Sequence, residues 1–448
     1  MVSPEEFAVS SSIFLDFRLP ESTTWFYFSF FLTIALFFQF GRVLTLRNWD
    51  LVALFLFGPG LLLILQAKGD AEPGASRVRL VGYLWLLGAS AYWFGRCLFD
   101  LATVKRPLVT PNLSTAGLAW FAGSLFLCFT AVAFTRTDPW GTVGKRPAAL
   151  AGVQEGATAV VRQTTAHDKV NTEDWQSGVA PALAMACHLV VVAGLVLIGA
   201  RRFHDLPTGV AAGALYLLIP YTAFQIGQVH HVWPAALIVW AVYFFRYPTA
   251  AGGLVGLAAG TAFFPLLLLP AWAQFYRGRG ETRFLAGAIA GGAVGLAATL
   301  YVLAYDGQFL EGVRRTLEQS DWQPWRVPTA ESVWVGIHWA YRLPVFILYA
   351  GFVITSYLWP PVRNLGHLLA VSAAVLIGVQ FWYADRGGLY VLWYAPLLVL
   401  IVLRPNLADQ EPVPPGPLPR VFGRIARWLG ERVRLPRPAT PPGMALRP

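Results

Sequence analysis

Long apolar runs separated by short polar connections dominate the chain. The runs lie near residues 24–41, 51–66, 80–99, 116–134, 179–200, 209–225, 232–245, 250–262, 264–276, 284–305, 344–358, 366–382 and 388–403. A helix needs about 20 apolar residues to cross a bilayer core of roughly 30 Å. The pattern therefore predicts an all-α fold, a polytopic transmembrane helical bundle of about thirteen spans (range about 11 to 13, because two runs are short).

The composition supports a membrane protein. Of the 448 residues, 56% are hydrophobic and only 13% are charged, whereas soluble domains carry about 25% charged residues. Mean hydropathy is +0.53. An open sheet in lipid would leave its edge hydrogen bonds unpaired, so helices are expected. Several tryptophans stand at the ends of apolar runs, and we expect them to form an interfacial belt: Trp25, Trp120, Trp272, Trp359 and Trp382.

Basic residues gather in alternate connections between the runs. This set contains Arg42, Arg47, Arg96, Lys105, Arg106, Arg201, Arg202, Arg246, Arg277, Arg279, Arg283, Arg363 and the arginines of the tail. Cytoplasmic loops carry an excess of Lys and Arg, so we expect this set and the C-terminus in the cytoplasm of a bacterial inner (plasma) membrane. The alternation requires the chain to reverse at Phe263-Phe264-Pro265. The opposite side then holds the loops 135–178 and 306–343 and the turn "IGQVHHVWP" at 226–234.

This topology divides the chain into four predicted regions. Residues 1–115 form N-terminal extra transmembrane helices, and 116–305 form a transmembrane module that includes the outer loop 135–178. Residues 306–403 hold the second outer loop and C-terminal transmembrane helices, and 404–448 form a basic, Pro-rich cytoplasmic tail. The net charge of +10 indicates positive-inside loops and contact with anionic membrane lipids, and no nucleic acid partner is expected.

Two local patterns within the apolar runs predict where helices pack closely and where one helix bends. Small residues recur every four positions at Gly252, Gly256 and Gly260 and again at Gly287, Gly291 and Gly295. Such stripes let two helices approach closely, so we expect structural packing there. Pro59 lies within Gly58-Pro59-Gly60 and is expected to kink its span, because proline removes a helix donor.

The candidate chemistry lies mostly in the outer loops. Arg136 and Asp138 follow a span directly, and a carboxylate held there could act as a general base towards a substrate hydroxyl. The alternative for Asp138 is a solvated loop acid. Arg314 and Arg315 lie on an amphipathic segment, where they face lipid headgroups or clamp a lipid-linked phosphate. Arg326 follows two tryptophans that could serve as a sugar platform or as interface anchors.

The turn between two apolar runs adds Gln228, His230 and His231. These side chains are either the polar end of a membrane helix or a donor set for a sugar phosphate. Adjacent histidines on a turn project in different directions, so no metal site is expected, and no cofactor-binding motif is present. Ionisable residues inside the runs are scarce. His188 is the clearest example, and a lone histidine there more often makes an interhelical hydrogen bond than relays protons.

From about residue 178 to 305 the chain resembles the integral-membrane C-type glycosyltransferases, in the branch that uses polyprenyl-phosphate-linked mannose. The resemblance rests on Pro220, Gly227-Gln228, the run 232–245, Arg246, "AGGLVGLAAG" and Phe263-Phe264-Pro265. It also rests on a seven-span layout that begins at 116–134 and has its long outer loop at 135–178. The lysine that the family places before this proline would fall at Ala262.

The resemblance implies a hexosyltransferase of the cell envelope. It would transfer a hexose, most simply mannose, from a polyprenyl-phosphate donor to an extracytoplasmic or lipid acceptor. Asp138 matches the family's catalytic acid. Gln228, His230 and His231 would contact sugar or phosphate, and Arg136, Arg314, Arg315 and Arg326 would hold the phosphate. Ala262 leaves open a non-catalytic membrane protein that binds or translocates a lipid-linked glycan, or a membrane partner within an envelope assembly.

Overall fold

The structure is a computed structural model that describes residues 21–69, 75–102, 111–135, 172–305, 324–325, 332–358, 364–383 and 390–412. The described residues contain helices and no strand, which confirms the predicted all-α class. The helices are α1 (Ser22–Phe37), α2 (Leu46–Ala53), α3 (Phe57–Gly69), α4 (Ala75–Asp100), α5 (Thr115–Thr135), α7 (Thr172–Arg202), α8 (Leu206–Leu218), α9 (Pro220–Phe224), α10 (Val229–Tyr243), α11 (Pro248–Thr261), α12 (Leu269–Phe275), α13 (Glu281–Tyr305), α15 (Arg342–Thr355), α16 (Leu365–Trp382) and α17 (Ala395–Leu403). Short 3-10 turns are η1 (Phe40–Arg42), η2 (Phe264–Leu268), η3 (Trp339–Tyr341) and η4 (Val391–Trp393).

Five helical segments within the described ranges are long and apolar enough to cross a membrane. They are Leu46–Ala67, Thr115–Phe134, Val179–Arg202, Glu281–Tyr301 and Leu365–Trp382. Shorter apolar helices account for other predicted runs, among them Ser22–Phe37, Leu206–Leu218 and Val229–Tyr243. The chain is therefore a helical protein with several helices suited to a membrane. The predicted number of about thirteen crossings stays a prediction, because several runs fold into short or interrupted helices.

The predicted kink at Pro59 takes the form of a short break at residues 54–56, one turn before the proline. Helix α2 ends at Ala53 and α3 begins at Phe57, with turns between them. Proline cannot donate to the carbonyl four residues before it and its ring clashes with that carbonyl, here that of Phe55. The helix therefore breaks in the turn that precedes the proline.

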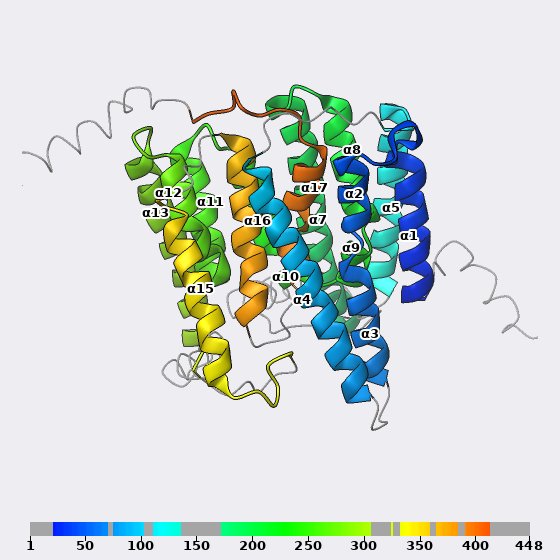
Figure 1. The fold of residues 1–448 in the computed structure, drawn as a ribbon, viewed down its shortest axis with the longest axis horizontal. Helices are drawn as coiled ribbons and strands as arrows, with labels where there is room; N and C mark the ends of the chain where they lie inside the picture. The colour runs from blue at the N-terminus through cyan, green and yellow to red at the C-terminus, as the bar shows by residue number, and fades with distance from the viewer. Residues whose placement is uncertain are drawn as a thin grey trace, which may run out of the picture. The chain divides into compact units, whose positions relative to one another are not determined.

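The basic connections lie together at one end of the bundle, which we call the basic end. Residues 404–412 cross this end as a strap along the top of the view in Figure 1. Arg246 Nη2 donates to Gln410 Oε1 at 2.9 Å, and Arg279 forms an ion pair with Glu411. The Leu365 amide donates to the Gln410 carbonyl at 2.9 Å. The connections on either side of α11 and α12 are thus at the same end, which confirms the predicted reversal near Phe263.

Further contacts bring other basic connections to this end. Arg47 Nη2 donates to the Leu403 carbonyl at 3.2 Å, and Arg202 Nε donates to the Tyr243 carbonyl at 2.8 Å. The long helices α5, α7 and α13 extend from this end to the opposite end, which we call the loop end. Thr135, Thr172 and Tyr305 lie at helix termini there, next to the two long predicted loops. The described members of the basic set lie at one end, as predicted. Lys105, Arg106, Arg363 and the arginines after residue 412 lie outside the described residues, and the assignment of the set to the cytoplasm stays a prediction.

Helices α11 and α13 pack backbone to backbone along their glycine stripes, at the left of Figure 1. A Cβ built on Gly256 would lie 2.0 Å from the Ala288 carbonyl oxygen, and one on Gly291 would lie 2.0 Å from the Gly253 carbonyl oxygen. No side chain fits in that space. The predicted structural role of the glycines is confirmed, since only their absent side chains permit this approach.

The predicted tryptophan belt is wrong for three of its members. Trp25, Trp272 and Trp382 are 5%, 0% and 1% exposed, whereas Trp120 is 79% exposed. Trp272 Nε1 donates to Ser372 Oγ at 3.0 Å, so its polar edge is satisfied by a neighbouring helix rather than by water or headgroups. The end of an apolar run does not distinguish a lipid-facing tryptophan from one turned inwards. Trp359 lies outside the described residues.

Candidate functional site

The turn with the histidine pair is buried inside the bundle. Helix α8 ends at Leu218 before Pro220, the one-turn α9 follows, and α10 starts at Val229. His231 is 0% exposed, His230 is 4% exposed and Gln228 is partly exposed. The expected exposure of this turn to water is wrong, because both imidazoles are buried, and its assignment to the outer side stays a prediction. The 15 residues of α10 rise about 22 Å from the basic end, which is short of a hydrocarbon core of roughly 30 Å, so the turn lies below the loop end.

A second segment returns into the bundle and covers the histidines. Helix α16 runs for 18 residues to Trp382, but α17 has only nine residues, so residues 390–394 lie well inside the loop end. Trp393 Nε1 donates to the His230 carbonyl at 3.2 Å. The His231 ring stacks on Tyr390 with centroids 5.4 Å apart, and the two imidazoles are 4.4 Å apart. An aromatic wall therefore holds the histidine pair.

Histidine 188 supports the same turn from α7. Its Nδ1 lies 2.9 Å from the hydroxyl of Tyr216 on α8, and both side chains are fully buried. This contact confirms the predicted interhelical hydrogen bond. The imidazole also interacts with the backbone of Ile226, at the start of the histidine turn. Nothing in the sequence pattern indicated Tyr216, because it stands in an uninterrupted apolar run.

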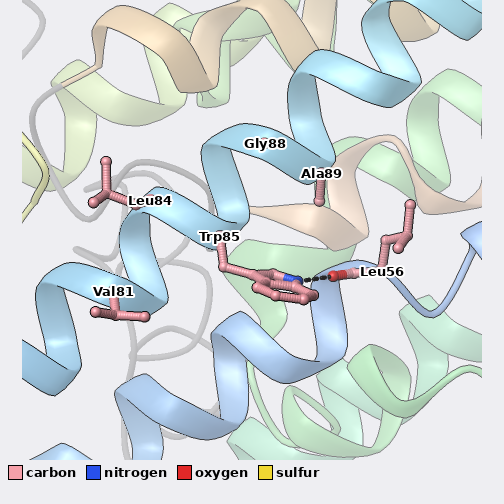
Figure 2. Close-up of a pocket in the computed structure, with 6 residues that line it drawn as sticks. All are labelled: Leu56, Val81, Leu84, Trp85, Gly88 and Ala89. Atoms are coloured by element: carbon pink, nitrogen blue, oxygen red, sulfur yellow. Dashed lines mark hydrogen bonds between the residues drawn. The ribbon is translucent and has the colours of Figure 1, made fainter.

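The interruption between α2 and α3 adjoins this region. Carbonyls at this break accept hydrogen bonds from side chains of other helices. Tyr221 Oη donates to Leu54 at 2.5 Å and Trp93 Nε1 to Ala53 at 3.0 Å. Trp85 Nε1 donates to Leu56 at 2.6 Å (Figure 2). The Phe57 ring contacts both Tyr221 and Tyr394, with centroids 5.8 Å apart in each pair.

Three connections therefore meet: the break between α2 and α3, the turn from α8 to α10, and the segment before α17. We call residues 54–57, 219–231 and 390–394 the broken-helix core. Non-helical backbone at membrane depth is tolerated only where it is buried in protein or lines a polar cavity. Helix breaks such as that between α2 and α3 form substrate and ion sites near the midplane of many transporters. The broken-helix core, with Gln228, His230 and His231, is the candidate functional site.

A cluster of buried charges at the basic end was not foreseen from the sequence. Arg96 donates through Nε and Nη2 to the two carboxylate oxygens of Asp50 at 2.7 and 2.8 Å, and through Nη1 to Asp100 at 3.2 Å. Arg404 donates to Asp100 through Nη2 at 2.5 Å and Nε at 3.1 Å. Exposure is 0% for both aspartates, 6% for Arg96 and 3% for Arg404. We call these four residues the charge quartet, and its two positive and two negative charges balance.

Of the predicted site residues, the structure brings together Gln228, His230 and His231. Asp138, Arg136, Arg314, Arg315 and Arg326 lie outside the described residues. Within the described ranges, no three His, Cys, Asp or Glu side chains are grouped as a metal site would require. Sequence reasoning missed Tyr390 and Trp393, whose only signal was their position shortly after Asp385 and Arg386, at the start of the last apolar run.

Comparisons with known proteins do not assign a family. No protein-family model, no curated protein and no solved structure matches the chain. The glycosyltransferase resemblance therefore rests on the short motifs and span order described above.

Proposed function

We propose that the chain is a membrane hexosyltransferase that transfers a sugar, most simply mannose, from a polyprenyl-phosphate donor to an extracytoplasmic or lipid acceptor. The observation that supports this proposal is the buried polar turn with Gln228, His230 and His231 in the broken-helix core. A polar group inside a membrane bundle is costly unless it has partners or a role. Amide and imidazole groups can form hydrogen bonds with the hydroxyl and phosphate oxygens of the donor's sugar phosphate.

The proposed transfer assigns a role to each candidate residue. Asp138 accepts the proton of the acceptor hydroxyl as its oxygen attacks the anomeric carbon of the donor sugar. The bond from that carbon to the phosphate oxygen breaks, and the phosphate leaves with the electron pair. Arginine donors stabilise this phosphate by charge-assisted hydrogen bonds, which is the role proposed for Arg136, Arg314, Arg315 and Arg326. Gln228 and the histidine pair orient the sugar.

Purified protein incubated with radiolabelled polyprenyl-phosphate mannose and a lipid or glycan acceptor tests the proposal. Transfer of label is expected for the wild type, together with release of free polyprenyl phosphate. Asp138→Asn and His231→Ala should lose transfer, whereas His338→Asn, a change at an exposed helix cap outside the candidate site, should retain it. Wild-type protein without transfer to any acceptor, or Asp138→Asn with wild-type transfer, would refute the assignment.

A second function is favoured by the broken-helix core itself. A membrane protein that binds or translocates a lipid-linked glycan without cleaving it needs polar backbone at membrane depth and needs no general base. Ala262, which is buried and brings no charge, fits this function. Saturable binding of polyprenyl-phosphate mannose without release of polyprenyl phosphate would favour it, whereas release would exclude it.

A further inference from the structure

An apolar groove lies on the surface of α4, beside the interruption between α2 and α3. Its volume is about 480 Å³, and its lining residues are Leu56, Val81, Leu84, Trp85, Gly88 and Ala89 (Figure 2). The indole N–H of Trp85 is already bonded to the Leu56 carbonyl, so the lining has no unused side-chain donor. Val81, Leu84 and Trp85 are 52%, 52% and 46% exposed. The groove is thus open to the outer surface of the helix and suited to an apolar occupant.

A cation stands on the same face of α4 as the groove. Residues four, seven and eight positions apart share a helix face, and this spacing places exposed Arg77 in line with Val81, Leu84 and Trp85. Asp100 at the far terminus of α4 belongs to the charge quartet, so Arg77 is near the loop end. Arg77 precedes Val81 by about 6 Å and Gly88 by about 16 Å along the axis. The groove therefore has a positive charge at one end and apolar walls further along α4, towards the basic end.

We propose that this groove binds an acyl chain of an anionic membrane phospholipid whose phosphate contacts Arg77. A guanidinium forms charge-assisted hydrogen bonds with phosphate oxygens, which a neutral side chain would not. Basic residues near a membrane surface also favour anionic over zwitterionic lipids. The volume is within the usual range of small-molecule sites, about 300 to 1,000 Å³. This site lies on α4 and does not depend on the proposed sugar transfer.

The glycines of α4 provide a matched pair of variants. A Cβ added at Gly88 meets no atom within 4 Å, so Gly88→Phe can fill the groove without displacing the backbone. Gly95 is on the same helix, is also exposed, and likewise meets nothing within 4 Å, but it does not line the groove. Gly95→Phe therefore adds the same side chain to the same helix and leaves the groove open.

The experiment uses the full chain reconstituted in vesicles that contain phosphatidylglycerol with a photoreactive diazirine in its acyl chain. After illumination, mass spectrometry locates and quantifies the labelled peptides. Labelling is expected on α4 around residues 81–89. It should fall about fivefold or more in Gly88→Phe and remain unchanged in Gly95→Phe. Peptides of α5, where Trp120 and Leu127 are 79% and 69% exposed, provide the internal standard for general lipid contact.

A second part of the experiment tests the contact between Arg77 and the lipid phosphate. In wild-type protein, diazirine-labelled phosphatidylglycerol should label the groove about fivefold more than phosphatidylcholine with the same chain, as expected for one basic residue. Arg77→Gln should remove this preference. Because Arg77 is exposed, this variant tests the proposal even if Gly88→Phe does not fold. Equal labelling of wild type and folded Gly88→Phe would overturn the proposal, as would an intact preference in Arg77→Gln. Displacement of the label by polyprenyl phosphate at about a tenth of its concentration would also overturn it, since the occupant would then be an isoprenoid lipid.

Discussion

The charge quartet gives the sharpest prediction about stability. Asp100 accepts hydrogen bonds from Arg96 at 3.2 Å and from Arg404 at 3.1 and 2.5 Å, and it is completely buried. Asp100→Asn preserves the shape of the side chain but removes its charge and replaces one acceptor with a donor. That donor would face a guanidinium. The buried quartet then carries one uncompensated positive charge.

The expected loss follows from the three bonds to Asp100. A hydrogen bond with a charged partner contributes about 1.5–3 kcal/mol, and a neutral one contributes about 0.5–1.5 kcal/mol. Neutralising Asp100 should therefore lower the free energy of unfolding by about 1 kcal/mol per hydrogen bond, or about 3 kcal/mol for the three bonds. This agrees with the roughly 3–5 kcal/mol measured when one partner of a buried ion pair is removed. Because folded proteins are stable by only about 5–15 kcal/mol, the loss should be easy to detect.

The assay is reversible denaturant unfolding in detergent for wild type, Asp100→Asn, Arg404→Gln and the double variant. Removing both partners restores neutrality, so the double variant should lose less free energy of unfolding than the sum of the single losses, by about 0.5–3 kcal/mol. Glu411→Gln is the matched control, because Glu411 pairs with Arg279 at a surface where these side chains are 47% and 44% exposed, and such pairs contribute about 0–1 kcal/mol. An Asp100→Asn variant within about 0.5 kcal/mol of wild type, or strictly additive losses, would refute this reasoning.

Two further predictions concern packing and backbone satisfaction. Gly256→Ala should lower the free energy of unfolding by about 1–3 kcal/mol, because its Cβ would lie 2.0 Å from a carbonyl oxygen of α13, whereas Gly292→Ala should be neutral or slightly stabilising because its nearest neighbour is at 3.5 Å. Thermal unfolding of both variants measures this, and equal midpoints would contradict the close approach. Tyr221→Phe should cost about 1–3 kcal/mol by leaving a carbonyl of the α2–α3 interruption without its donor. Tyr341→Phe is the control, because Tyr341 is 72% exposed and the loss of its hydroxyl should change the free energy of unfolding by less than about 0.5 kcal/mol. Equal changes in the two variants would show that the buried Tyr221 hydroxyl does not stabilise the fold.

The sequence predicted the helices well because hydropathy and small-residue spacing are local properties. Each apolar run contains helix, and the stripes at Gly256 and Gly291 meet as expected, since period and side-chain size decide which helix faces can approach. The alternation of basic connections likewise predicted which connections share one end. Arg246 and Arg279 confirm it through contacts with neighbouring residues of the strap.

The candidate site could be predicted only in part. The polarity of Gln228, His230 and His231 marked the turn, but hydropathy assigns a polar turn to the water-facing end of a helix. The short α10 and the return of residues 390–394 place it inside, and both depend on where helices stop rather than on local polarity. Asp138 and the predicted phosphate-binding arginines stay predictions, since they lie outside the described residues.

The sequence by itself determined that the chain is helical, that several helices suit a membrane and that the basic connections share one end. Only the tertiary structure decided which polar residues are buried together. Asp100 and Arg404 are 304 positions apart and form one ion pair. The sequence pattern assigns Arg96 to a connection between helices, because Arg96 is near the end of an apolar run. The physical reason is that a buried charge needs a partner of opposite sign. The partner of Asp100 is Arg404, which directly follows α17 near the other end of the chain.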